Sequence, residues 1–172
     1  MSSANPLGSI YFVKIPADAK FSSAAMKIDS NIELPVQKKN LDDPVEEDFA
    51  KLTEEQILSG ILTVLAYDKE NKNADYYRKI IKEVRPNIKK ELAEAAILKA
   101  RDEQWDLAEE IWLAVLGIDP EDYAIILNMA IFYDQKADSF RHNSLNEDAD
   151  AFDDLAYTYY KKVLNSDKEI PD

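Results

Sequence analysis

Cys and His, the side chains that most often supply nucleophiles, acid–base groups and transition-metal ligands, are almost absent from this chain. The 172 residues include no Cys and a single His, His142. These counts exclude thiolate nucleophiles, disulfides, thiolate metal sites and centres built from several imidazoles. Arg141 and Ser144 are near His142, but no spacing supplies a partner that would position it for catalysis, so we interpret it as a surface residue. We therefore predict no enzymatic activity, no catalytic residue and no cofactor.

One acidic stretch, residues 146–154 (Asn-Glu-Asp-Ala-Asp-Ala-Phe-Asp-Asp), offers the carboxylate oxygens that calcium prefers. It lacks the Gly and the terminal Glu that an EF-hand loop needs at fixed positions. Acidic residues at the start of a helix are also stabilised by the helix dipole without any metal. We interpret the stretch as a solvated acidic loop that caps a helix, and we predict no metal site.

The overall charge and the lengths of the apolar runs argue against two classes of partner. There are 21 Lys and Arg against 34 Asp and Glu, a net charge of −13. Binding to a phosphate backbone needs clustered basic residues, so we predict no nucleic-acid partner. No apolar run approaches the roughly 18 to 20 residues that span a bilayer, so we predict no membrane insertion. Residues 1–14 lack the basic segment that begins a secretory signal, which favours a cytoplasmic location.

Residues 1–50 form a predicted N-terminal arm of extended or mixed structure. Ile10–Val13 predicts a short strand, residues 32–36 a second extended segment, and the spacing of apolar residues over 21–28 a short helix. Residues 1–40 carry a net charge of +2, and the remainder carries −15. We predict that the arm packs on a helical body formed by residues 51–172. A sharper alternative is that the arm lies in a groove of that body.

From Thr53 onward, apolar residues recur at the spacing of helices that bury one face, which predicts an all-α body of six helices. Thr53 and Gln56 have the spacing of a capping box at the start of the first helix. Asp119 and Pro120 predict the start of the fifth, with Asp as the cap and Pro at the first helical position.

The helical pattern repeats with a period of 34 residues. Four columns of similar residues share this period, which is hard to obtain by chance. The columns are Pro86 and Pro120; Ala74 and Ala108; Leu62, Ala96 and Ala130; and Leu58, Leu92 and Ile126.

This pattern resembles the tetratricopeptide repeat family, whose unit is a 34-residue helix–turn–helix. The repeats would be residues 55–88, 89–122 and 123–170. The second matches best, through Ala96, Trp105, Ala108, Trp112 and Pro120.

The third repeat departs from the family pattern. The small residue of its second helix is expected at position 142, where the chain has His142, and the matching residue is Ala156. This displacement predicts a polar insertion in the turn of the repeat, near residues 136–149.

The resemblance implies a right-handed superhelix of antiparallel helix pairs, an α-solenoid. Members of the family bind a peptide or protein segment in a concave groove lined by the first helix of each repeat. Here the groove residues would be Ser59, Thr63, Tyr67, Lys90, Ala93, Ile97, Arg101, Leu127, Ile131, Asp134 and Gln135.

The resemblance therefore predicts a non-enzymatic adaptor or scaffold that binds a protein or peptide partner. Some family members hold a C-terminal carboxylate with Lys, Asn and Arg, but Ser59, Thr63 and Ala93 stand here instead. The apolar centre of the groove better suits an apolar segment, with Lys90 and Arg101 as polar anchors. Two alternatives stay open: the arm or another chain fills this surface, or the chain is a structural or oligomerisation module whose arm and terminal helices bury against another copy.

Overall fold

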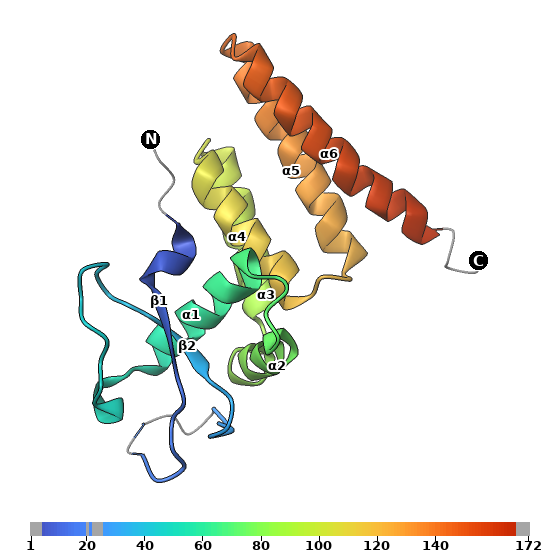
Figure 1. The fold of residues 1–172 in the computed structure, drawn as a ribbon. Helices are drawn as coiled ribbons and strands as arrows, with labels where there is room; N and C mark the ends of the chain where they lie inside the picture. Colours follow the sequence, from blue (N-terminus) through green and yellow to red (C-terminus); the bar gives the residue numbers. More distant parts are fainter. Residues whose placement is uncertain (1–4, 20, 22–25, 168–172) are drawn as a thin grey trace. The chain divides into compact units, whose positions relative to one another are not determined.

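The computed structural model describes residues 5–19, 21 and 26–167, and it divides into two compact units, residues 1–91 and residues 92–172. The described chain is mostly helical (Figure 1), as predicted. Its α-helices are α1 (Glu54–Tyr67), α2 (Ala74–Val84), α3 (Ile88–Arg101), α4 (Trp105–Ile118), α5 (Tyr123–His142) and α6 (Asn146–Asp167). The first unit also holds the 3-10 helices η1 (Pro6–Ser9) and η2 (Phe49–Lys51) and the strands β1 (Ile10–Val13) and β2 (Leu34–Gln37).

The arm of the first unit is built on a two-stranded antiparallel sheet. Ile10 pairs with Gln37 and Val13 with Leu34, so β1 has the bounds that the sequence predicted. Leu34 and Val36 of β2 are fully buried, and β2 packs against α1. Because an isolated two-stranded ribbon is marginally stable in water, this packing on the helix is what holds the arm.

Helix α1 begins at the predicted capping box. The backbone N–H of Gln56 donates to Thr53 Oγ1 at 3.1 Å, and the backbone N–H of Thr53 donates to Gln56 Oε1 at 3.2 Å. Two N–H groups that have no partner within the helix are thereby satisfied, which is typically worth about 1 kcal/mol. The buried face of α1 includes Ile57, Ile61 and Leu65, as its spacing predicted.

The helix bounds repeat with the period seen in the sequence. Helices α1 and α3 have the same length and begin one period apart, at Glu54 and Ile88. Helices α2 and α4 end one period apart, at Val84 and Ile118. Each position of α1 therefore has an equivalent position in α3.

The second unit has one hydrophobic core shared by α3, α4, α5 and α6. Small residues, Ala96, Ala108 and Ala130, lie fully buried in it beside the large aromatic side chains of Trp112 and Phe132. Small side chains let helix axes approach closely, and the aromatic side chains fill the remaining space.

The turn of the third predicted repeat differs from the predicted insertion. Residues 136–142 continue α5 and residues 146–149 begin α6, so the acidic loop expected near 136–149 is helical and the connection is confined to residues 143–145. The two long helices pack along each other, and Arg141 Nη2 links them by pairing with Asp150 at 3.2 Å and with Asp153 at 2.6 Å. The extra residues therefore lengthen the hairpin.

The start of α5 also differs from the prediction at Asp119 and Pro120. The cap is Asp122, whose carboxylate accepts from the backbone N–H groups of Ala124 and Ile125. Residues 22–25 of the predicted short helix and residues 168–170 of the predicted third repeat lie outside the described residues.

Candidate functional site

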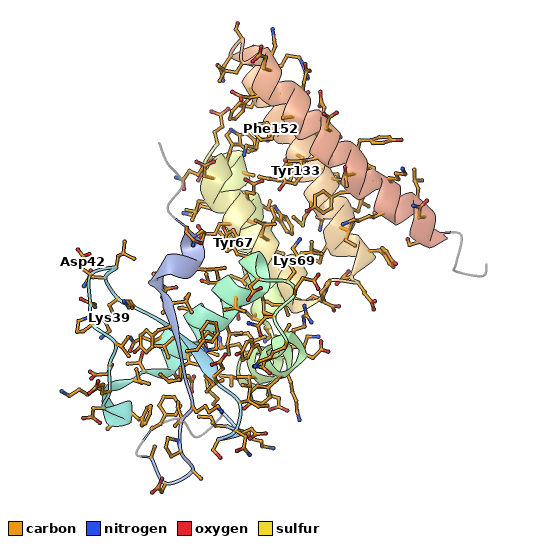
Figure 2. The ribbon with its side chains drawn as sticks, viewed as in Figure 1. Lys39, Asp42, Tyr67, Lys69, Tyr133 and Phe152 are labelled. Carbon is orange, nitrogen blue, oxygen red and sulfur yellow. The ribbon has the colours of Figure 1, made fainter. Side chains whose placement is uncertain are left out.

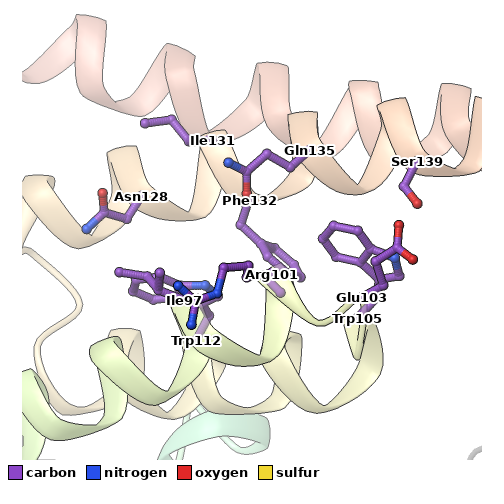
Figure 3. A pocket seen from close by; sticks show the side chains of 11 residues that line it. Ile97, Arg101, Glu103, Trp105, Trp112, Asn128, Ile131, Phe132, Gln135 and Ser139 are labelled. Atoms are coloured by element: carbon purple, nitrogen blue, oxygen red, sulfur yellow. The ribbon is translucent and has the colours of Figure 1, made fainter.

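The second unit contains an open cleft of about 610 Å³ between the C-terminal half of α3, the start of α4 and the middle of α5. Figure 3 shows side chains from α3 and α5 extending into the cleft from opposite sides. The residues that line it are Ile97, Ala100, Arg101, Glu103, Trp105, Trp112, Asn128, Ile131, Phe132, Gln135 and Ser139.

The base of the cleft is aromatic. Trp112 and Phe132 are each only 2% exposed, and the rings of Trp105 and Phe132 lie 6.0 Å apart at a tilt of 55°. Tilted aromatic pairs of this kind stabilise one another beyond the area that they bury. Both Trp residues of the sequence thus lie in the cleft.

The walls of the cleft are apolar and exposed. Ile97 on α3 is 54% exposed, and Ile131 on α5 is 40% exposed. Two large aliphatic side chains on facing helices above an aromatic base provide a surface that gains free energy when an apolar group covers it, at about 25 cal/mol per Å².

Polar groups stand at intervals around these apolar residues. Arg101, Asn128 and Gln135 can donate hydrogen bonds, and Glu103 can accept them. Such a mixture suits the backbone and side chains of a peptide, whose N–H and C=O groups need partners when they leave water.

Glu103 reaches the cleft from a left-handed backbone conformation. Its φ is 59° in the turn between α3 and α4, where the backbone N–H of Gln104 donates to the carbonyl of Lys99 at 2.9 Å. This is the usual way for a helix to end, although Gly or Asn is the commoner residue at such a position.

An ion pair between the buried Lys136 and the half-buried Glu109 links α5 to α4 behind the cleft. Lys136 is 3% exposed, and its Nζ lies 3.5 Å from Glu109 Oε1 and 4.1 Å from the ring centroid of Phe152. Tyr133 donates to Glu109 Oε2 at 2.5 Å. Figure 2 marks Tyr133 on α5 and Phe152 on α6. The network joins α4, α5 and α6, so it holds α5 in place behind the cleft.

The structure brings part of the predicted groove together. Ile97, Arg101, Ile131 and Gln135 line the cleft. The other predicted positions of the second unit do not line it: Ala93 packs against the hydrophobic core, Leu127 is 38% exposed on α5, and Asp134 accepts a hydrogen bond from Tyr160 at 2.7 Å. Burial, together with this hydrogen bond, raises the pKa of Tyr160 to about 12.

The predicted groove positions of the first unit are Ser59, Thr63, Tyr67 and Lys90. Strand β2 reaches Thr63, whose Oγ1 lies 3.4 Å from Gln37 Oε1. Ser59 and Tyr67 are half-buried, and Lys90 is exposed at the start of α3.

Sequence reasoning misses the aromatic base of the cleft and four further lining residues, Ala100, Glu103, Asn128 and Ser139. The repeat pattern explains Trp105 and Trp112 as framework positions, although an aromatic framework residue beside a groove can also form its base. Asn128 lies three residues before Ile131, so helical spacing alone would have placed it on the same face.

Within the described residues, the side chains that could bind a metal ion are not clustered. No group of three or more His, Cys, Asp and Glu side chains among them is arranged to hold a metal ion. His142 is exposed at the end of α5.

No α-helix within the described ranges has the length and apolar character needed to cross a membrane.

Comparisons with protein-family models, with curated proteins and with solved structures found no match to this chain. The residues of the cleft themselves are therefore the basis for a functional assignment.

Proposed function

We propose that this chain is a non-enzymatic protein–protein interaction module, an adaptor or scaffold, which binds a peptide or protein segment in the cleft between α3 and α5. The observation that carries the proposal is the exposure of Ile97 and Ile131 on facing helices above the buried Trp112 and Phe132. An exposed apolar surface rimmed by polar residues is typical of a protein-binding site.

The helix bounds repeat with the period of the sequence pattern, which supports a tetratricopeptide-type arrangement of the helix pairs. In such arrangements each pair packs against the next, and the first helices of successive pairs share a face. Helices α3 and α5 are the first helices of the second and third predicted repeats, and both line the cleft.

The proposal is tested by selecting ligands from a displayed library of random peptides on the full chain. Ile97→Lys/Ile131→Lys places two charges in the walls, and both positions are exposed enough to tolerate them. We expect the selected peptides to bind this variant at least about tenfold more weakly, a loss of about 1.4 kcal/mol. Leu164→Lys is the matched control, because Leu164 is 63% exposed on α6 and does not line the cleft. Peptides that bind all three proteins equally would contradict binding in the cleft.

A second copy of the chain is the alternative partner. Tyr157 and Leu164 of α6 are 67% and 63% exposed, and they are two helical turns apart, so they lie on one side of the helix. If this face formed a dimer, light scattering on dilution would give a mass of two chains that falls to one for Leu164→Lys. A mass of one chain at every concentration would exclude this alternative.

A further inference from the structure

In the first unit, strand β2 of the same chain covers one face of α1. Gln56 Nε2 donates to the carbonyl of Gln37 at 3.2 Å, and Thr63 Oγ1 lies 3.4 Å from Gln37 Oε1. Between them, a Cβ built on Gly60 would lie 2.5 Å from the carbonyl oxygen of Pro35. Strand β2 therefore lies directly on the face of α1 that carries Gln56, Gly60 and Thr63.

The repeat period places the same positions in the cleft of the second unit. The equivalents of Thr63 are Ile97 in α3 and Ile131 in α5, and both line the cleft. The equivalents of Gly60 are Glu94 in α3 and Asn128 in α5, and Asn128 lines the cleft. The cleft is thus the counterpart of a helix face that the chain covers with its own strand in the first unit.

We propose that the ligand of the cleft is an extended, strand-like peptide segment with consecutive apolar residues flanked by Lys or Arg. This inference rests on the proposed function, because it names the class of ligand for the same site. The occupant of α1 has this character: Leu34-Pro35-Val36 is extended and apolar, and Lys38 and Lys39 follow it.

The lining of the cleft fits an extended backbone. In the first unit an amide side chain, that of Gln56, donates to a strand carbonyl. In the cleft the side chains of Asn128, Gln135 and Arg101 can make the same kind of bond from two facing helices (Figure 3). An extended segment leaves its carbonyls available for such donors, whereas a helix uses most of its carbonyls internally.

The apolar side chains of the ligand would meet Ile97 and Ile131. The equivalent residue of the first unit, Thr63, is polar and faces the side-chain amide of Gln37. At the equivalent positions the cleft has an isoleucine on each of two helices, above Trp112 and Phe132. The ligand side chain that fits there is therefore aliphatic or aromatic, whereas Thr63 fits an amide.

Charge specifies the flanks of the ligand. Residues 92–172 contain seven Lys and Arg against nineteen Asp and Glu, a net charge of −12, so this unit carries nearly all of the chain's −13. A strongly acidic surface attracts a basic segment and repels an acidic one, and the effect weakens as salt rises.

The test uses the full chain and three synthetic peptides. The first has the sequence of residues 31–39, Asn-Ile-Glu-Leu-Pro-Val-Gln-Lys-Lys, the second carries Lys38→Glu/Lys39→Glu, and the third has the same apolar residues and lysines at helical spacing without proline. None contains Trp, so the fluorescence of Trp105 and Trp112, the two Trp residues of the chain, reports occupancy of the cleft.

We expect the first peptide to change the tryptophan fluorescence saturably and to bind Ile97→Lys/Ile131→Lys at least tenfold more weakly, with Leu164→Lys unchanged. The second peptide should bind at least about fivefold more weakly than the first at low salt, and this difference should shrink at about 0.5 M salt. Absence of saturable binding of the first peptide up to about 1 mM, which corresponds to about 4 kcal/mol, would overturn the inference.

Failure of this inference and failure of the proposed function give different results. If the helical peptide binds better than the first peptide and requires Ile97 and Ile131, the cleft is a binding site but its ligand is not strand-like. If neither the synthetic peptides nor any library peptide depends on Ile97 and Ile131, both proposals are wrong.

Discussion

Gly60→Ala is the substitution whose effect on stability most directly tests the packing of the arm. In a helix whose neighbours leave space, Gly→Ala stabilises by about 0.5 to 1 kcal/mol, because Ala loses less backbone entropy on folding. In this chain the new Cβ would lie 2.5 Å from the carbonyl oxygen of Pro35 and 2.7 Å from its carbonyl carbon. Both atoms belong to the backbone of β2, so no side chain can rotate to make room.

The size of this loss of stability follows from the packing and the hydrogen bond that β2 would lose. To restore contact distance, β2 must move away from α1 by roughly half an ångström or more, and overpacking of this kind typically costs about 1–3 kcal/mol. The same movement lengthens the 3.2 Å hydrogen bond from Gln56 to Gln37, a bond worth about 1 kcal/mol. After the gain in helix propensity is subtracted, we expect Gly60→Ala to lower the free energy of unfolding by about 1–3 kcal/mol.

Urea denaturation followed by circular dichroism measures this change, and hydrogen exchange locates it. The backbone N–H of Lys38, which donates to the carbonyl of Ser9 at 2.9 Å beside the sheet, should exchange faster in the variant. Ser59→Ala, one residue earlier on α1, is the control for propensity and should change stability by less than about 0.5 kcal/mol. A Gly60→Ala protein as stable as the parent, or more stable, would refute the close packing of β2 on α1.

Three further predictions concern other contacts. Lys136→Met should lower the free energy of unfolding, measured in urea, by about 1–3 kcal/mol, because Glu109 loses its buried cation. Adding Glu109→Gln should recover part of this loss. Equal stability of the parent and the single variant would contradict the prediction. Burial raises the pKa of Tyr77 to about 12, so on raising the pH this tyrosine ionises in the unfolded chain before it ionises in the folded one. The free energy of unfolding, measured in urea, should therefore fall between about pH 10 and pH 12, by about 2 kcal/mol more than in Tyr77→Phe. Parallel pH profiles of the two proteins would contradict this prediction. Ser144, with φ of 64°, should tolerate Ser144→Gly with a gain of up to about 1 kcal/mol in thermal unfolding, and a loss of stability would contradict the left-handed turn.

Local rules predict the parts of the fold that local chemistry decides. The strand Ile10–Val13 and the capping box of Thr53 and Gln56 are predictable because each depends on a few adjacent residues. The predicted start of α5 is wrong because the sequence offers two Asp caps three residues apart. Asp122 is the one whose carboxylate reaches two N–H groups of the helix.

The extended hairpin of α5 and α6 could not be predicted from polarity. Residues 136–149 are polar because most of them face solvent on long helices, so their composition resembles that of a loop. Lys136 is the buried charged residue of this stretch, and its burial depends on Phe152 and Glu109, which come from two other helices. Such distant partners leave no trace in the local pattern.

The candidate site is predictable in part, for a related reason. Ile97 and Ile131 follow from the repeat period, because equivalent positions face the same way. The contact between β2 and Thr63 depends on the pairing of β2 with β1. That pairing joins segments far apart in the sequence, so local patterns do not predict it. Gly60, the one Gly of α1, was the available indication that another backbone approaches this helix.

The most direct test of binding in the cleft is a two-dimensional NMR titration of the isotope-labelled full chain with a library-selected peptide. We predict that the indole N–H signals of Trp105 and Trp112 and the backbone signals around Ile97, Arg101 and Ile131 shift together and saturably. These shifts should disappear in Ile97→Lys/Ile131→Lys. Shifts confined to the exposed face of α6 around Tyr157 and Leu164, with both indole signals unmoved, would contradict the cleft as the binding site.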